Sequence, residues 1–211
     1  MNSLDSIAAL PDGALTSPAA RRNAEPILRV LRAHLPAAGS VLEIASGSGE
    51  HAVAFSAALP GLRWTPSDPS AEARDSIAAW TRATALPHLA PPLALDAQDP
   101  TTWPTGPFDA VYCANMTHIS PWSATEGLMD LAGRILRRPG GLLVLYGPYR
   151  ETEVPLAPSN AAFDASLKSR NPDWGLRDRD AVQTLARAHG LIATLRVPMP
   201  AENLMLLFRT V

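Results

Sequence analysis

The fold is decided by the stretch Val41-Leu42-Glu43-Ile44-Ala45-Ser46-Gly47-Ser48-Gly49-Glu50-His51. Its first five residues form a short, mostly apolar run that predicts a buried strand, and apolar residues return at helical spacing after the two glycines. Glycine has no Cβ, so a ligand can approach the turn closely, and the first N–H groups of the following helix are free to bind it. The stretch therefore predicts a strand, a glycine turn and a helix that together hold a nucleotide-like ligand.

Strands and helices alternate outward from this turn. The expected helices are 19–35, one through 52–55, 70–84, 124–136 and 178–189, and the expected strands are 41–45, 62–67, 93–95, 108–113, 142–146, 191–197 and 204–208. Such alternation is typical of a parallel sheet, and the last two strands, joined by a short connection, should form an antiparallel hairpin. The sequence therefore predicts an α/β fold.

Two segments lie outside this alternation. Residues 1–18 mix small, polar and turn residues, which indicates a flexible arm or a lid. Residues 147–177 are too long for an ordinary connection and are rich in proline, tyrosine and tryptophan, so we expect an insertion that covers a substrate. A chain of 211 residues fits one domain, and we expect residues 1–211 to form it.

Composition excludes several classes of partner. The net charge is -2 and no basic run exceeds a pair, so we expect no nucleic-acid partner. No apolar run approaches 20 residues and no signal segment is present, so we expect a cytoplasmic protein without a membrane partner. The single Cys113 and the scattered histidines predict no metal site. A small molecule is the partner that this composition favours.

Acidic residues end three successive expected strands, at Glu43, Asp68 and Asp96. A carboxylate at Glu43 suits the amino-acid half of S-adenosylmethionine (SAM) and would repel a pyrophosphate. Asp96 can accept a hydrogen bond from an adenine amine. The spacing Gly47-x-Gly49-x-x-Ala52 also fits the dinucleotide fingerprint, so an NAD-dependent oxidoreductase stays an alternative.

The pattern Glu43-x-Ala45-x-Gly47-x-Gly49 resembles motif I of class I SAM-dependent methyltransferases, with Ala45 at the usual place of the first glycine. The resemblance implies that Asp68 bonds the ribose hydroxyls and that Asp96 and Ala97 border the adenine. It also implies a Rossmann-like sheet of seven strands, mostly parallel with an antiparallel last strand, and helices on both faces.

A closer resemblance covers nearly the whole chain. It is to the methyltransferase-like 26 family, formerly a domain of unknown function, and four segments carry it. These segments are Arg22–Leu28, Leu42–His51, Asn115–Trp122 and Tyr146–Tyr149. The resemblance implies SAM as the cofactor and leaves the acceptor open.

Ligands of open α/β sheets bind beyond the carboxyl ends of the strands. Arg22 and Asn23, in the first helix, could reach the methionine carboxylate, and His51, at a helix N-terminus, should stay neutral. The residues expected to contact SAM are Arg22, Asn23, Glu43, Ala45, Ser46, Gly47, Gly49, His51, Asp68, Pro69, Asp96, Ala97, Asn115 and Met116.

Two residues are expected to take part in catalysis. His118 follows the fourth major strand, where an imidazole of near-neutral pKa could remove a proton from the acceptor. Tyr146 ends the fifth strand and is the second candidate. A base is not obligatory, because positioning alone accelerates displacement at an activated methyl group. His118 could therefore instead contact a loop carbonyl or the cofactor.

Aromatic and polar residues around the insertion predict an acceptor pocket. Tyr149 and Trp174 could pack against the acceptor, and Arg177 could pair with its carboxylate or phosphate. Alternatively, Trp174 anchors the insertion and Arg177 pairs with a neighbouring aspartate. The residues expected to bind substrate are Trp122, Tyr149, Asn160, Trp174 and Arg177.

These features predict a methyltransferase that transfers a methyl group from SAM to an oxygen or nitrogen of a small molecule. The alternatives are a SAM-binding protein that transfers another alkyl group, catalyses a cyclisation or acts as a non-catalytic partner, and the NAD-dependent oxidoreductase. Against the oxidoreductase alternative, the sequence lacks a Tyr-x-x-x-Lys pair for hydride chemistry.

Overall fold

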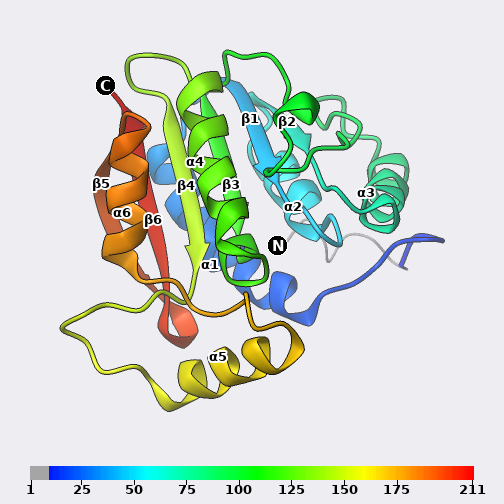
Figure 1. Ribbon diagram of the computed structural model, residues 1–211. Coiled ribbons are helices and arrows are strands. Elements are labelled where there is room, and N and C mark those ends of the chain that lie inside the picture. The colour runs from blue at the N-terminus through cyan, green and yellow to red at the C-terminus, as the bar shows by residue number, and fades with distance from the viewer. Residues whose placement is uncertain (1–9) are drawn as a thin grey trace.

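A six-stranded sheet forms the centre of the computed structural model, which describes residues 10–211 (Figure 1). Its strands are β1 (Gly39–Ile44), β2 (Leu62–Pro66), β3 (Ala110–Ala114), β4 (Leu142–Gly147), β5 (Leu191–Met199) and β6 (Asn203–Thr210). They lie in the order β2-β1-β3-β4-β6-β5. The first four strands of this order are parallel, and β6 is antiparallel to both of its neighbours. The predicted α/β sheet with an antiparallel last strand is confirmed.

Helices cover both faces of the sheet. They are α1 (Pro18–His34), α2 (Glu50–Ala58), α3 (Ala71–Thr84), α4 (Trp122–Ile135), α5 (Pro158–Arg170) and α6 (Arg179–Ala188). Side chains of α1, α2 and α3 pack with one set of strand residues, such as Val41, and side chains of α4 and α6 pack with the alternate set, such as Leu42. Figure 1 shows α4 and α6 in front of the sheet. Because successive side chains of a strand point to opposite faces of the sheet, each face has its own apolar core.

The helix boundaries follow from local chemistry. Ser17 caps α1 by accepting a hydrogen bond from the Ala20 N–H, and Asp178 caps α6 by accepting from two N–H groups. Such caps satisfy N–H groups that have no partner inside the helix. The positions expected from the sequence for these two helices agree with the structure to within a residue or two.

The prediction of seven strands is wrong, because residues 93–95 do not form a strand. Leu93 makes only an isolated parallel bridge with Ser67. Pro91 and Pro92 immediately precede it, and proline has no N–H to extend a ladder. The segment nevertheless lies beside β2, so the residues that follow Leu93 still reach the carboxyl edge of the sheet.

The described part of the N-terminal arm packs against α3. Ala14 is buried, the Leu15 N–H donates to Ser76 Oγ at 2.8 Å, and the Trp80 indole donates to the Leu15 carbonyl at 3.1 Å. Residues 14 and 15 are therefore held against α3. The rest of the predicted arm, residues 1–9, lies outside the described residues.

The insertion 147–177 contains α5, a helix that the sequence did not predict. Its buried side chains are Asn160, Asp164 and Leu167, at helical spacing, and two of the three are polar. Hydrophobic periodicity therefore gives no signal for this helix. Figure 1 shows α5 beyond the carboxyl ends of the strands, where Asp164 accepts from Lys168 Nζ and the Leu176 N–H, each at 2.8 Å.

Replacing Gly127 in α4 tests the packing that holds the 96–98 segment. A glycine-to-alanine change inside a helix normally stabilises it by about 1 kcal/mol. A Cβ at Gly127 would lie 1.9 Å from the Ala97 carbonyl oxygen. We therefore expect Gly127→Ala to lower the free energy of unfolding in urea by about 1 kcal/mol or more.

The control is Ser166→Ala, at an exposed position of α5, which should change the free energy of unfolding by less than about 0.5 kcal/mol. A Gly127→Ala protein as stable as the wild type would show that the Ala97 backbone moves freely.

Candidate active site

A cavity of about 320 Å³ opens at the carboxyl ends of the parallel strands. Its walls come from the ends of β1 and β2, the 95–98 segment, the residues after β3 and the start of α4. It brings together seven residues that the sequence predicted for the cofactor site, namely Ala45, Asp68, Pro69, Asp96, Ala97, Asn115 and Met116. We call it the strand-end cavity.

The turn after β1 depends on left-handed backbone conformations. Ala45, Gly47 and Gly49 have φ values of 54°, 57° and 88°. Ala45 occupies the place where the resemblance expects a glycine, and its positive φ shows why glycine is usual there. A Cβ at Gly49 would lie 3.0 Å from Ile77 of α3, whereas nothing lies within 4 Å of a Cβ at Gly47. Gly49 thus permits close packing, and Gly47 adjoins open space.

Asp68 joins the end of β2 to this turn. One of its carboxylate oxygens accepts from the Gly47 N–H at 3.0 Å and the other accepts from the Ser70 N–H at 2.9 Å. Its side chain borders the strand-end cavity while the residue is only 8% exposed. Each carboxylate oxygen has a second lone pair, so the group can still accept hydrogen bonds from a ligand.

Glu43 is turned away from the strand-end cavity. It does not line the cavity, and its carboxyl group accepts from the Trp64 indole at 2.7 Å. Burial raises the pKa of Glu43 to about 8, so the group is mostly protonated at neutral pH. In this geometry Glu43 belongs to the core beneath α2.

His51 and Glu50 fasten α1 to α2. His51 donates through Nε2 to the Ala20 carbonyl at 3.0 Å, which leaves Nδ1 to accept from the Tyr112 hydroxyl at 3.3 Å. Burial lowers the pKa of His51 to about 4. The fully buried Glu50 carboxylate accepts from Arg21 Nε at 2.5 Å. His51 therefore holds helices together and does not line the strand-end cavity.

Tyr146 ends β4 with a hydroxyl group that hydrogen-bonds to no residue in the described part of the chain, although the residue is 1% exposed. Burial raises the pKa of Tyr146 to about 12, and the nearby charge of Arg22 opposes this shift. The group is thus a neutral phenol. Arg22 and Asn23 lie on the first turns of α1 and do not line the strand-end cavity.

His118 is buried beneath the insertion and does not line the strand-end cavity. Its Nδ1 accepts from the Arg177 N–H at 3.4 Å, so the proton lies on Nε2, which is 3.3 Å from Thr117 Oγ1. Burial lowers the pKa of His118 to about 3. A Cβ at Gly147 would lie 2.5 Å from Nε2, so the glycine makes room for the ring. Neither ring nitrogen faces the cavity.

Arg177 ties the end of the insertion to the loop after β3. Its guanidinium donates to the carbonyls of Thr117 at 2.8 Å and Ser120 at 2.6 Å, and its carbon lies 5.7 Å from the centre of the Trp122 ring. Trp174 stacks instead with Arg170, at 5.4 Å. Of the predicted substrate residues, Trp122 and Arg177 therefore lie beside the loop, and Trp174 lies at the end of α5.

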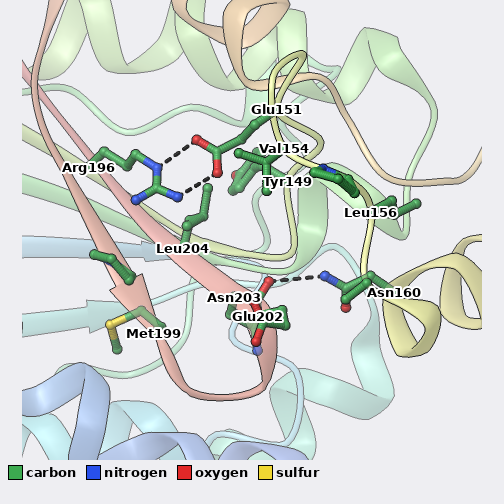
Figure 2. Close-up of a pocket in the computed structure, with 13 residues that line it drawn as sticks. Tyr149, Glu151, Val154, Leu156, Asn160, Arg196, Met199, Glu202, Asn203 and Leu204 are labelled. Carbon is green, nitrogen blue, oxygen red and sulfur yellow. Dashed lines mark hydrogen bonds and ion pairs between the residues drawn. The ribbon is translucent and has the colours of Figure 1, made fainter.

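Tyr149 and Asn160 line a second cavity, of about 90 Å³, between the insertion and the β5–β6 turn (Figure 2). We call it the hairpin cavity. Glu151 accepts from Arg196 Nε at 2.6 Å on one wall, and Asn160 Nδ2 donates to the Glu202 carbonyl at 3.0 Å on another. Nothing in the local sequence around Glu151, Arg196 and Glu202 predicts this site, because these distant segments meet only in the folded chain.

Within residues 10–211, no three or more histidine, cysteine, aspartate or glutamate side chains gather where they could hold a metal ion. The same residues contain no helix with the length and apolar character needed to cross a membrane.

Solved methyltransferase structures share this fold. An O-methyltransferase family protein from Burkholderia thailandensis is 18% identical, with a TM-score of 0.77 over 91% of this chain and 57% of that chain. The mitomycin 7-O-methyltransferase MmcR is 18% identical, with a TM-score of 0.76 over 92% of this chain and 54% of that chain. CalO1, a methyltransferase in calicheamicin biosynthesis in its SAH-bound form, is 16% identical, with a TM-score of 0.73 over 92% and 54%.

These comparisons confirm the Rossmann-like methyltransferase fold, and the chain spans little more than half the length of the proteins it matches. A family model described as "Protein of unknown function (DUF938)" matches residues 15–210. The match covers nearly the whole chain, and the chain therefore belongs to the DUF938 family.

Proposed function

We propose that the protein is a SAM-dependent methyltransferase that acts on an oxygen or nitrogen of a small molecule. The observation that carries the proposal is the strand-end cavity, where Asp68 and Asp96 border the space beside the turn at Gly47. The shared fold with O-methyltransferases, one of them SAH-bound, supports it. The four segments quoted above support the relationship to the methyltransferase-like 26 family.

The strand-end cavity fits SAM by its chemistry. Asp68 and Asp96 offer carboxylate oxygens to ribose hydroxyls and an adenine amine, while Ile44, Leu95 and Ala97 provide apolar walls. Gly47 leaves open space at the turn. When bound, SAM supplies an electrophilic methyl group on a sulfonium. Asp96 is held for this role, because one of its oxygens accepts from the Gln98 N–H at 2.8 Å.

The two catalytic candidates take different roles in this proposal. Tyr146 carries a neutral phenol with an unpaired hydroxyl at the end of β4, so it can orient an acceptor by a hydrogen bond. His118 stays neutral and joins the loop after β3 to the insertion, so we assign it to positioning.

Calorimetry separates the proposed function from the oxidoreductase alternative. We expect SAM and S-adenosylhomocysteine to bind with measurable heat and NAD to give none, because the cavity presents two carboxylates and no cation to a pyrophosphate. Binding of NAD without binding of SAM would overturn the proposal.

Asp68→Asn should weaken SAM binding by about 1.5 kcal/mol or more, roughly tenfold, because a charged acceptor is lost at the ribose. Asp99→Asn is the matched control, since Asp99 caps a short 3-10 helix and does not line the strand-end cavity. An equal dissociation constant for Asp68→Asn and the wild type would remove Asp68 from the cofactor site.

The neutral state of His118 should appear in the pH dependence of stability. The pKa falls from an ordinary 6.5 to about 3 on folding, so the unfolded chain binds more protons and this group lowers stability as pH falls from about 6.5 towards 3. His118→Gln cannot take up that proton. The difference in unfolding free energy between wild type and mutant should therefore shrink by about 1–2 kcal/mol between pH 7.5 and pH 5.

Ser166→Ala, at an exposed position of α5, removes no titratable group and is the control, so its difference from the wild type in unfolding free energy should stay constant between the two pH values. If the difference in unfolding free energy between wild type and His118→Gln stayed constant between the two pH values, His118 would titrate normally and face solvent.

A further inference from the structure

The hairpin cavity lies immediately beyond the end of β4. Leu204, one of its lining residues, pairs with Gly147, and Tyr149 follows two residues later. The strand-end cavity lies on the β3 side of the same strand end and contains Asn115, whose N–H donates to the Tyr146 carbonyl at 2.8 Å. The two cavities therefore flank the segment around Tyr146.

The side-chain oxygens of Asn160 and Asn203 are unpaired hydrogen-bond acceptors. Asn160 Nδ2 donates to the Glu202 carbonyl at 3.0 Å, and Asn203 Nδ2 donates to the Pro200 carbonyl at 2.9 Å. A carbonyl only accepts, so both amide groups are fixed with their nitrogen towards the turn. The Oδ1 atoms make no hydrogen bond with a described residue. Asn160 is 8% exposed, and Figure 2 shows it beside the turn.

The charges around the hairpin cavity leave one carboxylate without a partner among residues 10–211. Glu151 pairs with Arg196 at 2.5 Å and also with Arg179, which in turn pairs with Asp180 at 2.8 Å, so the charges of these residues cancel. Glu202 makes no ion pair or side-chain hydrogen bond with a described residue. The end of the cavity near Asn160 therefore favours a positive charge.

The β5–β6 turn that carries Glu202 is strained. Ala201 and Glu202 both have positive φ, at 58° and 54°, where glycine or asparagine is usual. Such conformations persist when the surroundings fix them, and they cluster at functional sites. The hydrogen bonds from Asn160 and Asn203 hold this turn in place.

We propose that the hairpin cavity binds the methyl acceptor through a protonated aliphatic amino group held by Asn160 Oδ1 and the Glu202 carboxylate. The acceptor assignment rests on the proposed function. The volume of about 90 Å³ restricts the site to a small group. Val154, Leu156 and Met199 also line it, so a short branched alkyl chain fits beside the amino group.

The experiment titrates the full chain with isobutylammonium, isobutanol and isovalerate, which share one alkyl group and differ in charge. NMR chemical shifts of the Asn160 side-chain amide report binding, in the presence and absence of saturating S-adenosylhomocysteine. We expect isobutylammonium to bind with a Kd on the order of millimolar, isobutanol to bind at least about fivefold more weakly, and isovalerate not to bind.

Two variants and one control locate the site. Glu202→Gln removes the charge at an exposed position and should weaken isobutylammonium binding at least about threefold. Asn160→Leu should abolish it. Because Asn160→Leu lacks the side-chain amide, binding to this variant is followed by the NMR chemical shift of the Leu204 backbone amide. Asn171→Ala, at the C-cap of α5 and outside the hairpin cavity, should bind isobutylammonium like the wild type.

Binding of isovalerate in preference to isobutylammonium, or unchanged affinity in both Glu202→Gln and Asn160→Leu, would overturn the amine site. Cofactor and acceptor must be bound together, so displacement of isobutylammonium by S-adenosylhomocysteine would overturn its assignment to the acceptor. If S-adenosylhomocysteine itself fails to bind while the amine still binds at Asn160, the proposed function falls and the amine site stands.

Discussion

Parallel pairing of β1 with β2 on one side and β3 on the other is the constraint on which the candidate active site depends. The register sets Glu43 opposite Pro66 and Tyr112, and the next pair of strands sets Ala114 opposite Tyr146. The carboxyl ends of these four strands therefore lie at one edge of the sheet, and the residues that follow each strand lie there too. Because these four strands are parallel, acids far apart in sequence become neighbours without any long-range sequence signal.

Local chemistry explains which parts of this arrangement could be predicted from sequence. Short apolar runs, the caps at Ser17 and Asp178 and the glycines at 47 and 49 act over a few residues, and the structure agrees with them. The helix α5 was missed because its buried face is built from Asn160 and Asp164, which carry no apolar period. The hairpin cavity was missed for a different reason, since its walls come from segments some forty residues apart that meet only through folding.

Side-chain direction was the least predictable property of the site. His118 and Glu43 both stand at carboxyl ends of strands, as the sequence indicated, yet both side chains point into protein. One pKa is lowered and the other raised by the same cause, which is that burial disfavours the charged form of either group. Glu50 is also fully buried, and its side chain pairs with Arg21. Position at a strand end therefore does not assign a chemical role until exposure and partners are known.

The insertion connects the two cavities mechanically. Arg177 donates to the carbonyls of Thr117 and Ser120, and the Tyr149 hydroxyl lies 3.3 Å from Thr117 Oγ1. Met116 and Ser120 line the strand-end cavity, whereas Tyr149 and Asn160 line the hairpin cavity. Thr117 is buried and makes contacts with both Arg177 and Tyr149, so the loop cannot shift without breaking bonds to the insertion. The same hydrogen bonds thus fix the shape of both cavities at the end of β4.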